Sequence, residues 1–204
     1  DRIGPYAFKN CVALKTVDLP ESLTSVGEAS FYACTALESL ELPEGLIRIG
    51  EYALNGAGVK KLAIPDTVTY MGYGVFESCA NLIEIKLPNK MESLTYGLLN
   101  CCYVLPEVTI PDGVTHIEGY ALAQNHQMTE ITLPVSVKSI AAQAFVYSSG
   151  LTDVYYAGTK AQANAIKLGA DNIILGAAAW HCSDGDMQGV GVTEGECGAA
   201  LTWS

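Results

Sequence analysis

Cysteines are the most numerous chemically reactive side chains in this sequence, and their spacing argues against catalysis and metal binding. Four of the seven share one sequence frame in which other copies carry Ala, Asn or Ser; they are Cys11, Cys34, Cys79 and Cys102. Such a position requires a small side chain in a crowded interior, so we expect buried free thiols. A disulfide between Cys11 and Cys34 is the alternative, with demanding geometry. No Cys-x-x-Cys pair is present, so we expect no metal site.

The three histidines complete no catalytic set. His116 and His126 occupy variable positions typical of exposed loops. His181 and Cys182 are sequence neighbours, whereas a nucleophile and its base normally come from distant segments. Asp184-Gly-Asp186 matches part of a calcium loop but lacks the remaining ligands. With no hydrolase, metalloprotease or nucleotide-binding motif present, we expect neither an enzyme nor a cofactor.

Two further cysteines lie outside the repeated frame, in a Gly-rich tail. If the protein is exported, Cys182 and Cys197 can form a disulfide that closes this tail into a loop.

Composition excludes several classes of protein. The chain has 204 residues, with 22 acidic and 11 basic side chains and a net charge of −11. A nucleic-acid partner would require a basic surface, which these few scattered cations do not provide. No run of ~18 apolar residues exists, so no segment is expected to span a membrane. We also expect no signal peptide within this sequence, because no basic segment precedes an apolar stretch.

A short motif repeats along most of the chain. Each copy reads apolar, two variable residues, apolar, one variable residue, apolar, then proline. The prolines recur every 22 or 23 residues, at Pro20, Pro43, Pro65, Pro88, Pro111 and Pro134. A seventh copy begins at Leu151 and has Ala157 in place of proline. A unit this short cannot bury a core alone, so the copies must stack on one another.

The repeats predict an α/β solenoid. The alternating apolar residues indicate a parallel sheet of about seven short strands. Proline ends each strand because it cannot donate to the ladder. The rest of each coil is too short for a long helix, so we expect one turn of α or 3₁₀ helix on the opposite side. The inward residues should form one column: Val17, Leu40, Leu62, Ile85, Val108 and Ile131.

The full motif, L-x-x-V/I-x-L-P-x-x-V-x-x-I-G-x-x-A-F-x-x-C, resembles that of the BspA-like leucine-rich repeats of bacterial surface and secreted proteins. The resemblance covers residues 3 to about 157. It implies a leucine-rich-repeat solenoid located outside the cell or on its surface, with a role in adhesion.

Three regions follow from the repeats and the resemblance. We expect an N-terminally truncated repeat array over 1–158, a capping segment with a short helix over 159–182, and a Gly-rich tail over 183–204 that leads to a further module. In the capping segment, Thr159 can N-cap a helix over 160–168 that Gly169 ends. Such a segment would cover the apolar end of the stack.

The outward positions of the predicted strands form two rows along the stack. The residues that we select as a candidate binding surface are Glu84, Lys86, Glu107, Thr109, Glu130, Thr132, Asp153 and Tyr155. Four of them are carboxylates on consecutive coils, and neighbours ~5 Å apart repel one another by ~0.8 kcal/mol in water. The row is either a solvated acidic face or a surface for a basic protein segment or a cation, with Tyr155 as an aromatic anchor.

Tyrosine is the commonest aromatic residue, with 11 copies. Tyr6, Tyr52 and Tyr120 share one repeat position, and Tyr73 and Tyr96 occupy the position before it. These residues predict a strip along one edge of the solenoid that suits contact with protein or glycan. Alternatively, the rings cover the corners of the coils and hydrogen-bond locally.

We expect a non-catalytic extracellular module that binds protein, either host matrix or another surface protein. Two alternatives stay open: a structural spacer or scaffold within a larger surface protein, and a carbohydrate-binding accessory domain. A fold alone does not decide among them.

Overall fold

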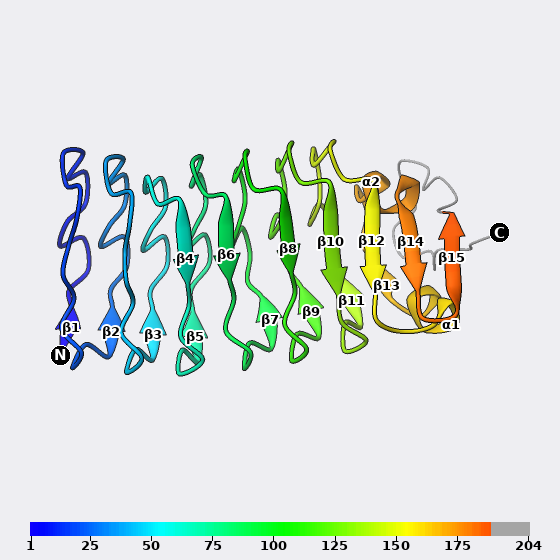
Figure 1. Cartoon of the computed structure of the whole chain (residues 1–204), viewed down its shortest axis with the longest axis horizontal. Helices are drawn as coiled ribbons and strands as arrows, with labels where there is room; N and C mark the ends of the chain where they lie inside the picture. Colours follow the sequence, from blue (N-terminus) through cyan, green and yellow to red (C-terminus); the bar gives the residue numbers. More distant parts are fainter. Residues whose placement is uncertain (189–204) are drawn as a thin grey trace.

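Two stacks of parallel strands run along the molecule on opposite sides of its core (Figure 1). The computed structural model describes residues 1–188. The long-strand face contains β4 (Lys61–Ala63), β6 (Glu84–Lys86), β8 (Glu107–Thr109), β10 (Glu130–Leu133), β12 (Asp153–Tyr156), β14 (Ala179–Cys182) and the antiparallel β15 (Gly185–Gln188). The short-strand face contains β1 (Arg2–Ile3), β2 (Ser25–Val26), β3 (Arg48–Ile49), β5 (Tyr70–Met71), β7 (Ser93–Leu94), β9 (His116–Ile117), β11 (Ser139–Ile140) and β13 (Lys167–Leu168).

The expected column of inward residues is present on the long-strand face. Leu62 pairs with Ile85, and Val108, Ile131 and Val154 follow in register. Trp180 extends the column by one coil and is 1% exposed. The solenoid prediction is therefore confirmed.

The prediction of a single sheet of about seven strands is only partly correct. The long-strand face is divided into a two-stranded ladder, β4–β6, and a five-stranded ladder from β8 to β15. In the first two coils only one isolated bridge, between Ser39 and Lys61, replaces the expected strands. Apolar stacking, with Leu40 at 6% exposure, therefore continues where ladder hydrogen bonds are sparse.

The prediction of helical turns opposite this sheet is wrong. In residues 1–158 the structure has turns and two-residue strands there instead. Two positions in each coil take a left-handed backbone, which ends any helical turn. The first is held by Tyr6, Ala29, Tyr52, Gly74, Gly97, Tyr120, Gln143 and Asp171, and the second by Asn10, Ala33, Gly56, Ser78, Cys101, Gln124 and Tyr147.

Backbone groups in these turns bond to the next coil. Leu54 N donates to Val75 O at 3.0 Å, and Phe76 N donates to Leu98 O at 3.0 Å. In a helical turn, these N–H groups would donate to carbonyl groups of the same coil. Here they donate to the next coil instead. This is the physical reason why turns replace the helices.

The repeated cysteine position is a buried hydrogen-bond donor. Cys34, Cys79 and Cys102 are free and buried, as expected, whereas Cys11 is exposed and unpaired with Cys34. The Cys79 thiol donates to Leu54 O at 3.2 Å, and burial raises its pKa to about 12. Ser148 makes the equivalent bond, donating to Leu122 O of the preceding coil at 2.7 Å. The position therefore accommodates a small side chain that can donate to the preceding coil, although Ala57 fills it without a donor.

The C-terminal coil ends the stack with a short helix and a hairpin. Thr159 N-caps α1 (Lys160–Asn164) as expected, in a capping box with Gln162. The helix stops at Asn164 rather than Leu168, because Lys167–Leu168 forms β13 and pairs with β11. Gly169 serves this stacking, since a Cβ there would collide with the backbone of Ala142.

A second helix, α2 (Ile173–Ala177), begins after the buried Asn172. The Asn172 side chain accepts from Phe145 N at 3.0 Å and donates to Ala141 O at 2.9 Å. In the other coils, the equivalent backbone groups bond to the next coil. At the end of the stack, the Asn172 side chain bonds to them instead. One buried amide thus satisfies the end of the stack.

Replacing Phe76 by alanine is expected to lower the free energy of unfolding by about 3–5 kcal/mol, because it opens a cavity in the continuous core. Phe76 is fully buried. Chemical denaturation measures the change. Ile83→Ala, at a side chain that is 46% exposed, is the control and should change stability by less than a third as much; an equal loss would contradict the stacked core.

Candidate binding surfaces

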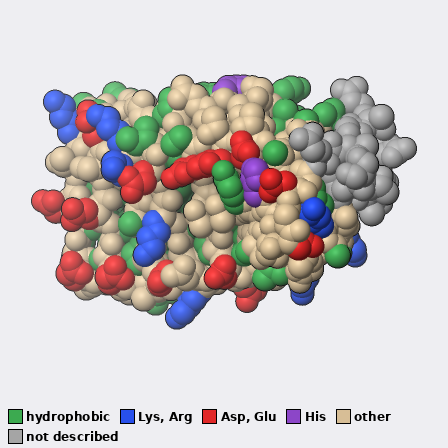
Figure 2. All heavy atoms as spheres, turned by 45° about the vertical axis from the view of Figure 1, so that its right-hand side comes forward, with side chains coloured by type: hydrophobic (Ala, Val, Ile, Leu, Met, Phe, Trp, Pro, Cys, Tyr) green, Lys and Arg blue, Asp and Glu red, His purple; other side chains and the backbone are tan. Residues whose placement is uncertain are grey.

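The long-strand face presents the predicted surface residues in register. Glu107, Glu130 and Asp153 are neighbours across three paired strands, and Thr109, Thr132 and Tyr155 form the second row. Glu84 and Lys86 lie on β6, in the adjoining ladder. Figure 2 shows acidic side chains gathered in a line with a histidine next to them. The strand alternation therefore carries these groups outward, while Val108 and Ile131 face the core.

The acidic row is neutralised at both ends. Glu84 Oε2 lies 2.6 Å from Lys61 Nζ, and Asp153 Oδ1 lies 2.7 Å from His181 Nε2. Among residues 1–188, no cation pairs with Glu107 or Glu130 in the middle of the row. The hydrogen bond with the Glu107 carboxyl, burial and the nearby charges of Glu107 and Asp153 raise the pKa of Glu130. This pair is therefore where the surface carries uncompensated like charge.

His181 is a functional group that sequence reasoning did not place. Its Nε2 lies 2.7 Å from Asp153 Oδ1 and its Nδ1 lies 3.1 Å from Asp186 Oδ1. Because both partners are carboxylates, this geometry favours the imidazolium form, in which both ring nitrogens donate. The hydrogen bonds to Asp153 and Asp186 raise the pKa of His181, and the His181 hydrogen bond lowers the pKa of Asp153.

The imidazolium joins β12, β14 and β15 and lies against an aromatic ring. Tyr155 stacks on His181 with ring centroids 4.8 Å apart and an interplanar angle of 23°. The pair forms a flat end to the acidic row. Its sequence signal is faint, because the last coil places Trp180 26 residues after Val154 rather than 23.

The calcium-like fragment Asp184-Gly-Asp186 forms a hairpin turn. Gly185 has a φ of 113°, and Asp184 Oδ1 accepts from Lys160 N at 2.8 Å. Over residues 1–188, no group of His, Cys, Asp and Glu has an arrangement that could hold a metal ion. Cys197 lies outside the described residues, so its disulfide with Cys182 stays a prediction.

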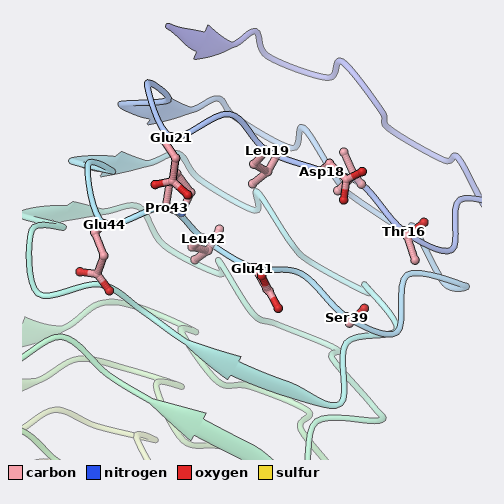
Figure 3. Close-up of a pocket in the computed structure, with 10 residues that line it drawn as sticks. Thr16, Asp18, Leu19, Glu21, Ser39, Glu41, Leu42, Pro43 and Glu44 are labelled. Atoms are coloured by element: carbon pink, nitrogen blue, oxygen red, sulfur yellow. The ribbon is translucent and has the colours of Figure 1, made fainter.

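A shallow cavity of about 360 Å³ opens between the outer segments of the first two coils (Figure 3). Its carboxylates are Asp18, Glu21, Glu41 and Glu44. It lies where the strand ladder is absent, and its acidic lining matches the net charge of the molecule. No cationic side chain lines it.

The tyrosines divide into two groups. Tyr52 and Tyr73 meet edge to face with ring centroids 5.4 Å apart, and Tyr96 and Tyr120 are 5.5 Å apart. Tyr6 is separate: its hydroxyl donates to Glu28, and Lys9 Nζ lies 5.2 Å from its ring centroid. The predicted strip is thus four residues on neighbouring coils with a fifth apart.

Comparison with known families identifies the repeats. A family model described as "BspA type Leucine rich repeat region (6 copies)" matches residues 1–128 and 48–166. These matches span well over half of the sequence, and the chain belongs to the BspA-type leucine-rich-repeat family. A search of curated proteins found no match.

Solved structures share this architecture. A leucine-rich repeat protein from Bacteroides ovatus is 26% identical with a TM-score of 0.60, and the match covers 76% of this chain and 52% of that one. A T. pallidum leucine-rich repeat protein is 25% identical with a TM-score of 0.62, covering 69% and 66%. The chain thus spans about half the length of the B. ovatus protein.

The clasp around His181 predicts a pH-dependent stability. His181→Gln is expected to lower the Tm by about 1–4 °C, as for a surface ion pair in a domain of this size. The loss should be largest between pH 3.8 and 6.5, the ordinary pKa values of Asp153 and His181. Above this window the stabilisation is lost as pH rises through the raised His181 pKa, and below it as pH falls through the lowered Asp153 pKa.

Thermal unfolding across pH measures this difference, with His126→Gln as the matched control. His126 is exposed, and its Nδ1 lies 3.5 Å from Ser149 Oγ. Among residues 1–188 it has no carboxylate partner. A wild-type minus His181→Gln difference that is constant from pH 4 to 9 would refute the charged clasp.

Proposed function

We propose that this protein is a non-catalytic binding module, located outside the cell or on its surface, that contacts a cationic protein segment through the long-strand face. The observation that carries the proposal is the Glu107–Glu130 pair, two neighbouring carboxylates with no cation between them. Family membership supports a surface location. No helix within residues 1–188 is long and apolar enough to cross a membrane.

Charge complementarity gives the partner its chemistry. A lysine or arginine side chain placed at Glu107 and Glu130 would offset their mutual repulsion, which contributes to the raised pKa of Glu130. The flanking carboxylates already have cationic partners: Lys61 pairs with Glu84, and His181 lies between Asp153 and Asp186. These groups bound the attractive region. An extended segment running along the stack would therefore place its cations over the centre of the row.

The second row supplies contacts that do not depend on charge. Tyr155 is 43% exposed and held flat by His181, so little side-chain entropy is lost when a partner covers it. Thr109 and Thr132 add exposed hydroxyls in the same row. These residues surround the charged pair with a surface suited to an apolar or hydrogen-bonded contact.

A spacer role within a larger surface protein is the competing function. A spacer would bind no ligand, so this role does not require unpaired charge on the long-strand face. The regions proposed over 1–158, 159–182 and 183–204 fit either role.

Glu107→Gln together with Glu130→Gln is expected to weaken binding of fluorescein-labelled decalysine at least tenfold at low salt, because two charge contacts are lost. Fluorescence anisotropy measures the Kd. The control is Glu92→Gln with Asp112→Asn, which makes the same charge change in turns outside the row. Wild-type protein that does not bind, or a Glu107/Glu130 variant that binds as tightly as the control, would refute the proposal.

A further inference from the structure

Four tyrosines form two aromatic pairs on consecutive coils, at the corner that follows the short strands. We call Tyr52, Tyr73, Tyr96 and Tyr120 the tyrosine ladder. They come from consecutive coils, after β3, β5, β7 and β9 respectively. Backbone bonds tie the coils together here: Tyr52 N donates to Tyr73 O at 3.0 Å, and Gly74 N donates to Tyr96 O at 2.9 Å. The spacing of the ladder is therefore that of the solenoid itself.

Glycines beside the ladder leave room for the rings. A Cβ on Gly74 would lie 2.5 Å from the Tyr52 ring, and the φ of Gly74 is +60°. A Cβ on Gly119 would lie 3.4 Å from the Tyr96 ring. The rings thus lie over bare backbone of the next coil, and Tyr73 and Tyr96 keep 45% and 50% of their surface exposed. The result is a partly exposed aromatic surface in which the paired rings are inclined to each other by 83° and 60°.

The aromatic contacts of the ladder are between its own rings, within the pairs Tyr52–Tyr73 and Tyr96–Tyr120. Within residues 1–188 the structure shows no hydrogen-bond partner for its four hydroxyls and no cation over its rings. The other tyrosines differ: the Tyr6 hydroxyl donates to Glu28, and the Arg48 guanidinium lies 3.9 Å from the Tyr70 ring centroid. Local hydrogen bonding therefore does not account for the ladder, and its ring faces and hydroxyls are available to a ligand.

The charges next to the ladder are acidic. The Glu118 carboxylate accepts from Tyr96 N at 3.0 Å, and Glu77 Oε2 would lie 3.1 Å from a Cβ on Gly74. Glu51 Oε1 lies 3.4 Å from the hydroxyl of Tyr70, on the neighbouring strand β5. Carboxylates repel phosphate, sulfate and uronic-acid groups, but they accept hydrogen bonds from neutral hydroxyls. The surroundings therefore favour an uncharged, hydroxyl-rich ligand over an anionic one.

We propose that the tyrosine ladder is a binding site for an extended neutral polysaccharide, whose sugar rings lie on Tyr73 and Tyr96. The C–H face of a pyranose is apolar and its rim carries hydroxyls, which matches an aromatic ring with a phenol at its tip and carboxylates beside it. Successive coils lie ~4.8 Å apart. This rise is comparable with the length of one sugar unit, so a chain along the solenoid axis meets one ring per coil.

The proposal is independent of the function assigned to the long-strand face, because it uses other residues on a different side of the coils. The test uses isothermal titration calorimetry of the full chain with β-1,4-linked hexasaccharides of glucose, N-acetylglucosamine and mannose. We expect at least one of them to bind, and Tyr73→Ala with Tyr96→Ala to raise its Kd at least tenfold. Tyr103→Ala with Tyr147→Ala removes two exposed rings outside the ladder and should leave the Kd unchanged.

Two further variants distinguish loss of the aromatic rings from misfolding and from effects of the acidic row. Tyr73→Phe with Tyr96→Phe keeps the rings and should weaken binding less than the alanine pair, even if the latter folds poorly. Glu107→Gln with Glu130→Gln should not affect sugar binding. Failure of all three hexasaccharides to bind, a phenylalanine pair no better than the alanine pair, or binding of heparin in their place would overturn the proposal. Loss of decalysine binding in the Tyr73→Ala with Tyr96→Ala variant would also overturn the proposal.

Discussion

The structure depends on the stacking of one coil on the next. Each coil contributes only a few inward side chains, and both faces of that layer must be covered by neighbours before water is excluded. The columns through Val108 and Ile131, and through Phe76 and Leu54, are fully buried only because they are continuous. Backbone N–H groups such as that of Leu54 bond to the next coil, so polar and apolar requirements are met by the same contact. No coil is independently stable in this arrangement.

Close stacking also decides where function can lie. The interior is filled by Phe, Leu and Cys side chains, and the opening between the first two coils is a shallow depression. Buried thiols such as that of Cys79 have a raised pKa and serve as hydrogen-bond donors in the core. What the solenoid offers to other molecules is therefore a set of surface rows with a fixed spacing. The acidic row and the tyrosine ladder are two such rows on different sides of the coil.

The repeat spacing was sufficient to predict the solenoid, its inward column and the outward row from Glu84 to Tyr155, because each follows from a period of two within a period of 23. It did not predict the turns opposite, since left-handed residues such as Tyr52 and Gln143 carry no shared side-chain type. His181 was missed because the last coil is longer than the others. The ion pairs that neutralise Glu84 and Asp153 depend on rotamers, which sequence spacing does not encode.

Amide hydrogen exchange on the full chain tests the stacking directly. The N–H groups of Leu54, Phe76 and Leu122 bond to the following coil, so they should exchange only through opening of the stack and show similar, strong protection. The N–H of Val12, near the exposed start of the first coil, should exchange much faster. Exchange of Leu54, Phe76 and Leu122 at rates typical of exposed loops would contradict the account.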